Sequence, residues 1–261
     1  MSPNKSFRQR MKEGERAIGP IVVIPSVHVA RMCALNPAVN YVWIDQEHGP
    51  IDRETAAAMT IAVSGHATPL LRVTSGETWL IKQVLDMGAG GVVVPMVDTP
   101  EQAEEIVRAI LYPPDGIRGY GPDIAALAQG LPIPQYAGNA NQDLLLVIQI
   151  ESVEGLKNAE KIARNDRVDV LFAGAYDISV CLGKPGKVLD PEVEAAILSV
   201  RDAAHKQGKL AGTIALTADL GQKRLDQGFD FLVTGTDMVL LTRALQDYAS
   251  SLAIPSASEK K

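Results

Sequence analysis

The sequence has few cysteines and few aromatic residues. Only Cys33 and Cys181 occur among 261 residues, and aromatic residues make up 5% of the chain. Two thiols cannot build the dense disulfide framework of a small secreted domain, so we expect both to be free, buried thiols in a reducing compartment. With so few aromatic rings, the core must be built from the aliphatic residues that dominate the 46% hydrophobic content.

The sequence also lacks a basic excess and a long apolar run. Its 25 Lys and Arg are outnumbered by 31 Asp and Glu, and the net charge of −6 argues against a nucleic-acid or acidic-membrane partner. No stretch approaches the roughly 20 apolar residues of a membrane span. Residues 1–19 are too polar for a secretory signal. We therefore expect a cytoplasmic protein that does not bind membranes.

What the sequence does contain is a series of short apolar runs at near-even spacing. They lie at 21–24, 41–45, 69–73, 91–95, 144–151, 168–174, 210–216 and 230–236. Each run is continuous rather than alternating, which is typical of parallel strands covered on both faces. Helical patterns at 78–88, 99–112 and 190–209 lie between them. Eight strand–helix units in about 250 residues predict a (β/α)8 barrel; a doubly wound sheet is the alternative.

The chain shows no linker that would divide it. We predict one barrel domain over residues 1–253, closed by a C-terminal helix, and a disordered tail over 254–261. Residues 112–143 hold five of the 16 prolines and interrupt the regular spacing, so they predict a long loop with one short helix. Long loops in compact domains are often functional.

Two acids follow neighbouring predicted strands. Glu151 ends the run at 144–151, and Asp177 follows the next run, 26 residues later. In such barrels the carboxyl ends of the strands share one face. Two hard oxygen ligands there suit Mg²⁺ or Mn²⁺, with water or substrate completing the shell. The alternative is that each acid caps the helix that follows it.

The other ionisable groups at strand ends are an arginine and a group around a histidine. Arg72 interrupts the apolar run 69–73, and it could form a salt bridge to Glu47 or stabilise a developing enolate or carboxylate. His48 follows Asp45 and Glu47 at the end of the run 41–45. A histidine beside acids can act as a general base whose ring an acid orients, although a lone histidine after a strand is more often structural.

Six segments together resemble the HpcH/HpaI aldolase family of class II, metal-dependent pyruvate aldolases. They are "IDQEHGP" (44–50), "LLRV" (70–73), residues 80–109, "YPPDGIRG" (112–119), "VIQIES" (147–152) and "AGAYDIS" (173–179). The likeness runs from about Phe7 to about Leu252. It implies a barrel of the phosphoenolpyruvate/pyruvate superfamily and a homo-oligomer, a hexamer or trimer, that often exchanges its C-terminal helix. The substrates implied are a 2-oxo acid and an aldehyde.

The resemblance also implies a role for particular residues. Glu151 and Asp177 would bind a divalent metal, Mg²⁺, Mn²⁺ or Co²⁺. Arg72 would stabilise the pyruvate enolate, and His48, beside Asp45, would be the acid/base. Asp86 matches the acid that raises the basicity of this histidine, and it would come from a neighbouring subunit. The positions that match substrate contacts are Arg72, Gln149, Gly174, Ala175, Tyr176 and Ile214.

The sequence departs from the family pattern at two places. The family commonly reads G-P-A-D where this chain has Gly174 to Asp177, so Tyr176 would narrow the pocket. The basic residue usual after Gly121 is missing, which leaves recognition of a second carboxylate without its cation. The leading hypothesis is an aldolase that cleaves a 4-hydroxy-2-oxo acid to pyruvate and an aldehyde. The alternatives are an oxaloacetate decarboxylase that resembles macrophomate synthase, and a non-catalytic binding or scaffold barrel.

Overall fold

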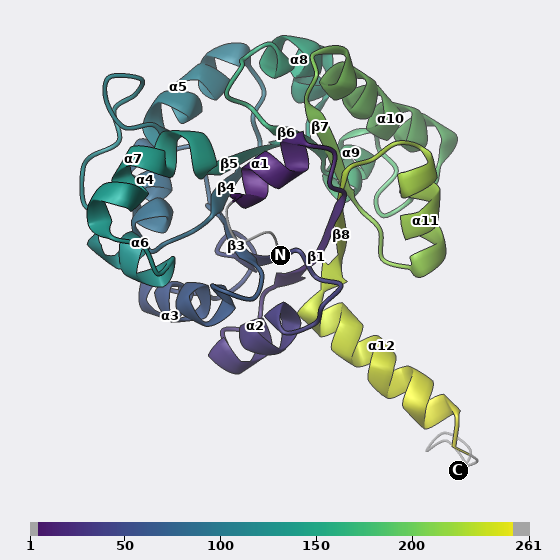
Figure 1. Cartoon of the computed structure of the whole chain (residues 1–261). Helices are drawn as coiled ribbons and strands as arrows, with labels where there is room; N and C mark the ends of the chain where they lie inside the picture. The colour runs from purple at the N-terminus through teal and green to yellow at the C-terminus, as the bar shows by residue number, and fades with distance from the viewer. Residues whose placement is uncertain (1–4, 253–261) are drawn as a thin grey trace.

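A computed structural model describes residues 5–252 and contains a closed barrel of eight parallel strands (Figure 1). Each strand pairs with the next, and the last pairs with the first, so the predicted (β/α)8 barrel is confirmed and the open, doubly wound sheet is wrong. The strands are β1 Ala17–Val22, β2 Tyr41–Asp45, β3 Thr68–Arg72, β4 Gly91–Val94, β5 Leu145–Ile150, β6 Val170–Ala173, β7 Leu210–Ile214 and β8 Phe231–Thr236.

The first strand begins four residues before the predicted run. The prediction started at Ile21, whereas β1 begins at Ala17 and runs through Gly19 and Pro20, a residue pair that usually marks a turn. The glycine is needed for a different reason. A Cβ at position 19 would lie 2.1 Å from the carbonyl oxygen of Tyr41 on the neighbouring strand, so only glycine allows the two backbones to approach.

Helices surround the strands and form the outer layer of the ring (Figure 1). The three helical patterns correspond to α4, α5 and α10, and Thr99 and Asp190 cap the last two with side-chain hydrogen bonds. The helices are α1 Phe7–Lys12, α2 Val27–Ala34, α3 Arg53–Val63, α4 Thr78–Asp86, α5 Pro100–Ile110, α6 Asp123–Ala128, α7 Ile133–Asp143, α8 Val153–Ala163, α9 Ala175–Cys181, α10 Pro191–Lys206, α11 Ala218–Asp226 and α12 Asp237–Ser250.

The prediction for residues 112–143 was wrong in part. Instead of a long loop with one short helix, this stretch contains both α6 and the 11-residue α7. Its prolines lie at positions that helices tolerate, because Pro132 and Pro134 flank the first residue of α7. Tyr136 and Ala140 are four residues apart and buried, so they hold the helix against the barrel although five of its other residues are polar Gln, Asn or Asp.

Side chains of the strands alternate between two separate cores. On β2, Tyr41 and Trp43 belong to the cluster inside the barrel, while Val42 and Ile44 belong to the layer between strands and helices. Phe7 and Met11 of α1 join the inner cluster from outside the strands. Figure 1 shows α1 lying across this end of the ring. The interior of the barrel is therefore packed and closed at the amino ends of its strands.

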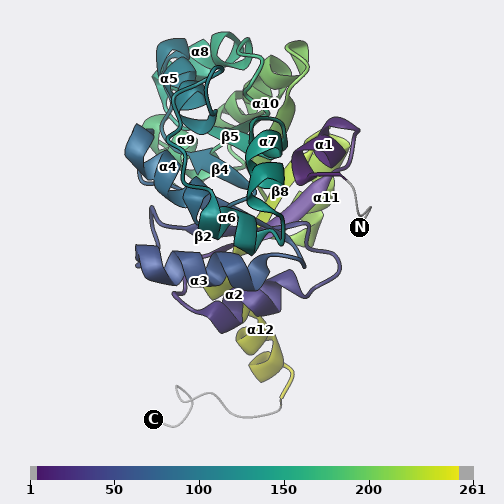
Figure 2. The same ribbon diagram turned by 60° about the vertical axis from the view of Figure 1, so that its left-hand side comes forward.

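The last helix projects away from the barrel (Figures 1 and 2). Much of its apolar surface is exposed, at Met238, Val239, Leu240, Leu241, Leu245 and Tyr248. The predicted disordered tail, residues 254–261, lies outside the described residues. None of the helices within residues 5–252 combines the length and apolar composition needed to cross a bilayer. Both cysteines are free, as expected, but neither is fully buried: Cys33 is half-buried and Cys181 is exposed.

Candidate active site

The predicted site residues on β2 and β3 are direct neighbours in the sheet. Asp45 and Arg72 are paired in register at the last positions of their strands, and both lie in the inward-facing series. The guanidinium donates through Nε to Asp45 Oδ1 at 2.9 Å and through Nη2 to Oδ2 at 2.6 Å. Asp45 is 1% exposed and Arg72 6%, so this two-bond ion pair is buried at the mouth of the barrel.

Arg72 is held by more than one partner. Its Nη1 lies 3.0 Å from Glu47 Oε2 and donates to Gln149 Oε1 at 3.3 Å, and the guanidinium lies 5.3 Å from the centre of the Trp43 ring. Burial alone would lower the pKa of Arg72, but the hydrogen bonds and charge of Asp45, with the other nearby carboxylates, raise it above its ordinary value. The guanidinium is therefore a fixed positive charge.

Glu151 lies beside this arginine and is 5% exposed. Its Oε2 accepts the backbone N–H of Met96 at 3.1 Å, and its Oε1 accepts the side chain of Gln149 at 2.7 Å. Met96 has a φ of 53°, uncommon for a residue other than glycine, and its N–H donates to this carboxylate. A Cβ at Gly174 would lie 2.5 Å from Glu151 Oε1, so the chain must approach the carboxylate there as glycine.

The helix-cap interpretation does not fit Glu151, whereas Asp177 does stand at the start of a helix. Ser152, not Glu151, caps α8 with a hydrogen bond from the N–H of Gly155. Asp177 lies in the first turn of α9, which begins after Gly174. Burial and the charge of Asp177 raise the pKa of Glu151 from 4.5 to about 7. A buried carboxyl group whose ionisation is opposed by burial and by a neighbouring acid is a place where a cation would be favourable.

His48 is the most exposed of the candidates at this mouth. Its side chain is 66% exposed, and its Nε2 lies 3.7 Å from Glu47 Oε2, too far for a hydrogen bond. The turn that carries His48 is held in place by Asp45, because the N–H groups of Glu47 and His48 both donate to Asp45 Oδ1. Burial raises the pKa of Glu47, against the charges of Arg72 and His48 that lower it.

Asp86 lies apart from the other candidates. It is the last residue of α4, whereas the others stand at strand ends, in the turns that follow them or in the first turn of α9. Its side chain pairs with Arg118, Oδ1 to Nη2 at 2.9 Å. None of the described residues of the barrel mouth is among its partners. Within one chain, Asp86 therefore belongs to a different cluster from His48.

The residues that match substrate contacts lie at the same mouth or at its edge. Gln149 is buried between Arg72 and Glu151. Ala175 begins α9 as a buried residue, and Ile214 ends β7. The Tyr176 side chain is 38% exposed, and partial burial raises its pKa.

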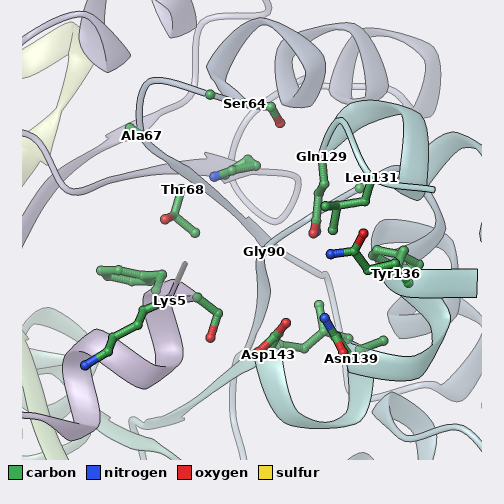
Figure 3. A pocket seen from close by; sticks show the side chains of 18 residues that line it. Lys5, Ser64, Ala67, Thr68, Gly90, Gln129, Leu131, Tyr136, Asn139 and Asp143 are labelled. Carbon is green, nitrogen blue, oxygen red and sulfur yellow. The ribbon is translucent and has the colours of Figure 1, made fainter. Parts of the chain in front are cut away.

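A cavity of about 400 Å³ lies elsewhere (Figure 3). Its walls include Thr68, Gly90 and Leu144, which stand at the amino ends of β3, β4 and β5. Tyr136, Asn139 and Asp143 line it from α7 (Figure 3). This cavity therefore opens at the end of the barrel opposite the candidate site.

The salt bridge between Arg72 and Glu47 that the sequence suggested is present, and Glu47 also lies near His48. Sequence reasoning missed two other contributors to the site. Trp43 was taken as part of a strand, although its inward position two residues before Asp45 places it beneath the guanidinium. That period of two was a usable signal. Met96 acts through its backbone, which no pattern of residue types reveals.

The closed barrel and the buried ionisable groups at one mouth define an enzyme of the (β/α)8 class. The chain belongs to the HpcH/HpaI aldolase/citrate lyase family, whose model matches residues 27–244. It is 36% identical to a hydroxypyruvate/pyruvate aldolase of Pseudomonas aeruginosa, over 98% of this chain and 97% of that one. It is 35% identical to a 4-hydroxy-2-oxovalerate aldolase of Rhodococcus jostii, over 97% of each chain.

Solved structures agree with this assignment. A family member from Burkholderia cenocepacia superposes with a TM-score of 0.86 and 29% identity, over 94% of this chain and 97% of that one. Macrophomate synthase superposes with a TM-score of 0.83 and 26% identity, over 94% of this chain and 88% of that one. The resemblance found in the sequence is therefore confirmed. The chain is a carbon–carbon lyase, and a non-catalytic barrel is not supported.

The raised pKa of Glu151 predicts an unusual dependence of stability on pH. With a pKa of 4.5 when unfolded and about 7 when folded, the folded chain binds more protons between these values. The free energy of unfolding should therefore fall as the pH rises from about 5 to about 8, by up to about 3 kcal/mol from this group. Urea unfolding in the presence of a chelator would measure it.

A matched pair of variants separates Glu151 from other acids. Glu151→Gln should remove most of the decline, leaving the smaller part due to Glu47, whose pKa is also raised. Glu154→Gln, three residues along on the exposed side of α8, should leave the decline unchanged. An unchanged slope in Glu151→Gln would contradict the assignment.

Proposed function

We propose that this protein is a divalent-metal-dependent aldolase that cleaves a 4-hydroxy-2-oxo acid to pyruvate and an aldehyde through a pyruvate enolate. The observation that carries the proposal is the buried Arg72, fixed beside the carboxyl pair of Glu151 and Asp177 at one mouth of the barrel. The names of the relatives from Pseudomonas and Rhodococcus support the same reaction class. The aldehyde that is released is not specified by these residues.

Glu151 and Asp177 are the residues that would hold the metal. The raised pKa of Glu151 supports this role, because a bound cation would relieve the opposition between the two acids. Within residues 5–252 there is no group of three or more His, Cys, Asp or Glu arranged around a metal position. A site made of Glu151 and Asp177 alone would leave the remaining coordination positions to water and substrate, as Mg²⁺, Mn²⁺ and Co²⁺ sites allow. When bound, the metal would supply Lewis-acid stabilisation of the oxygens of the 2-oxo acid.

Arg72 would supply the second positive charge at the developing enolate oxygen. Its Nε and Nη2 are engaged by Asp45, so the guanidinium plane is fixed before substrate binds. Gln149 holds both Arg72 and Glu151, and it therefore fixes the distance between them. Such preorganised charge stabilises the transition state more than the free substrate.

His48 would move the proton at the 4-hydroxyl group of the substrate. Its exposure places the imidazole at the entrance, where an aldehyde half would lie outside the pyruvate half. Tyr176 is partly exposed at the same mouth and would shape the space for that half. No lysine is needed, because no Schiff base takes part in this chemistry.

Asp86 would reach His48 only from a second copy of the chain. The apolar residues exposed on α12 support an assembly in which this helix packs against another subunit, as in a hexamer or trimer. The occupant proposed for that surface is a second copy of this chain. In such an assembly each site combines residues from two subunits.

A second candidate reaction uses the same enolate. The superposition on macrophomate synthase favours decarboxylation of oxaloacetate, followed by use of the enolate on another acceptor. Only the group lost from the 2-oxo acid differs between the two reactions. Release of CO₂ from oxaloacetate without aldol cleavage would favour this candidate.

Exchange of the methyl hydrogens of pyruvate in D₂O, followed by NMR, tests the function without knowledge of the aldehyde. We expect exchange that requires Mg²⁺, Mn²⁺ or Co²⁺ and is lost in Glu151→Gln, because that variant lacks the carboxylate ligand. Glu154→Gln should exchange like the unmodified protein. Absence of exchange with metal bound would overturn enolate formation from pyruvate, and oxaloacetate would then be tested.

A further inference from the structure

A second buried charge cluster lies away from the barrel mouth, around Arg118. The Arg118 residue is 1% exposed, and its guanidinium lies 4.4 Å from the centre of the Tyr112 ring. Its Nη2 donates to Asp86 Oδ1 at 2.9 Å and to the hydroxyl of Tyr136 at 3.1 Å. Tyr136 in turn donates to the carbonyl of Leu85, the residue before Asp86, at 3.5 Å. Three segments therefore meet on one arginine.

This arginine is costly for the fold. Its Nε and Nη1 make no hydrogen bond among the described residues, and Asp86 is the one carboxylate it pairs with there. Burial would lower the pKa of Arg118, whereas Tyr136 and Asp86 raise it, so the group stays charged. A buried charge with so few partners is poor evidence of a stabilising role, since an apolar side chain could fill the space at less cost. Its position calls for another explanation.

The geometry gives Asp86 one oxygen facing inward and one facing outward. Oδ1 is bound by Arg118, while Oδ2 lies on the side of Gly121, where a Cβ would come no closer than 3.7 Å. The carboxylate is 20% exposed and lines a surface cavity of about 490 Å³. The charged and titratable groups around it are Arg118, Tyr112 and Tyr136 on the buried side and Arg53, Glu54 and Asp123 across the cavity.

We propose that Arg118 is a positioning residue of the active site, which holds Asp86 so that its free Oδ2 meets the imidazole of a neighbouring subunit's His48. This rests on the proposed function. Arg118 itself touches no substrate and acts only through Asp86. The stacked Tyr112 and the bonded Tyr136 prevent the guanidinium from turning, so the carboxylate keeps one orientation. Gly121 leaves the space through which the imidazole would approach.

The pH dependence of turnover tests this role. A carboxylate held against His48 raises the pKa of the imidazole, and its loss lowers that pKa. We expect Arg118→Met, and likewise Asp86→Asn, to move the histidine limb of the kcat/KM profile to lower pH by about 0.5 to 1 unit. The probe is cleavage of 4-hydroxy-2-oxovalerate, followed by release of pyruvate. The double variant should shift the limb no further than Asp86→Asn alone.

Two further variants exclude a merely structural explanation. Arg118→Lys keeps the positive charge, so the histidine limb should lie between its position in Arg118→Met and its position in the wild type. Arg224→Met removes another buried arginine, 1% exposed, paired with Glu194 at 2.8 Å and close to the Phe229 ring. Arg224→Met should lower the melting temperature by about as much as Arg118→Met does, but it should leave the histidine limb of the kcat/KM profile at its wild-type pH.

The results separate the positioning role of Arg118 from the proposed aldolase function. An unmoved limb in Arg118→Met, or additive shifts in the double variant, would overturn the positioning role. Pyruvate exchange in D₂O would remain intact in that case, so the proposed function would stand. A wild-type chain that neither exchanges nor cleaves would overturn both.

Discussion

Replacing Arg72 with lysine should lower kcat for aldol cleavage by about 10²- to 10³-fold, the range seen when one oxyanion donor is lost. Lysine would keep a positive charge but could not satisfy Asp45 through two bonds while also reaching Glu47 and Gln149. The ammonium would settle on Asp45, away from the enolate oxygen. Steady-state kinetics with saturating metal, together with exchange of the pyruvate methyl group, would measure the loss.

The control for this prediction is Arg224→Lys. Arg224 is also a buried arginine with a carboxylate partner, but it belongs to α11 on the outer layer. It should lose stability with little change in kcat. If Arg72→Lys kept turnover within a factor of three of wild type while remaining folded, the guanidinium would not be the group that stabilises the enolate.

Mixing two impaired variants should restore activity if each site draws on two subunits. His48→Ala lacks the acid/base, and Asp86→Asn lacks the acid that supports it, so each alone should turn over slowly, although Asp86→Asn should keep enough activity for its pH profile to be recorded. When both chains are co-expressed, random assembly should give about a quarter of the sites both wild-type residues. Total turnover should rise to about a quarter of the wild-type value.

A second pairing tests whether recovery needs separate subunits. Co-expression of His48→Ala with Arg72→Lys joins two defects that lie at the same mouth of one chain, so a site could regain both residues only if they came from two different subunits. That mixture should stay near background. Equal recovery in both mixtures would contradict a shared site, as would failure of the first mixture to recover. Sedimentation would show whether the mixed chains assemble.

The barrel could be predicted because its strands are buried on both faces and spaced evenly. The same pattern misplaced the start of β1, because Gly19 serves a close approach between strands rather than a turn. It also concealed α7, whose few buried residues, such as Tyr136, stand among polar ones. Both errors arise because tertiary contacts, not local propensity, decide these segments.

The inner ring of site residues could be predicted for the same reason as the strands. Asp45, Arg72 and Glu151 follow inward-facing strand positions by even steps, so one face of the barrel collects them. The environment of Asp86 could not be predicted from the sequence, because it depends on how residues 112–121 fold back onto α4. The hydrogen-bond donor to the Glu151 carboxylate could not be predicted either, because it is the backbone N–H of Met96.

Within residues 5–252, the packed inner core closes the barrel at the amino ends of its strands. Phe7 and Met11 close the amino end, and the packed inner cluster fills the space behind Trp43. A molecule bound between Arg72 and Glu151 is therefore innermost, and anything attached to it extends toward His48 and the solvent. In the proposed reaction, the aldehyde fragment must depart before pyruvate can leave, and in the synthetic direction pyruvate must enter first. The order in which reactants bind and leave thus follows from the closure of the barrel at the amino ends of its strands.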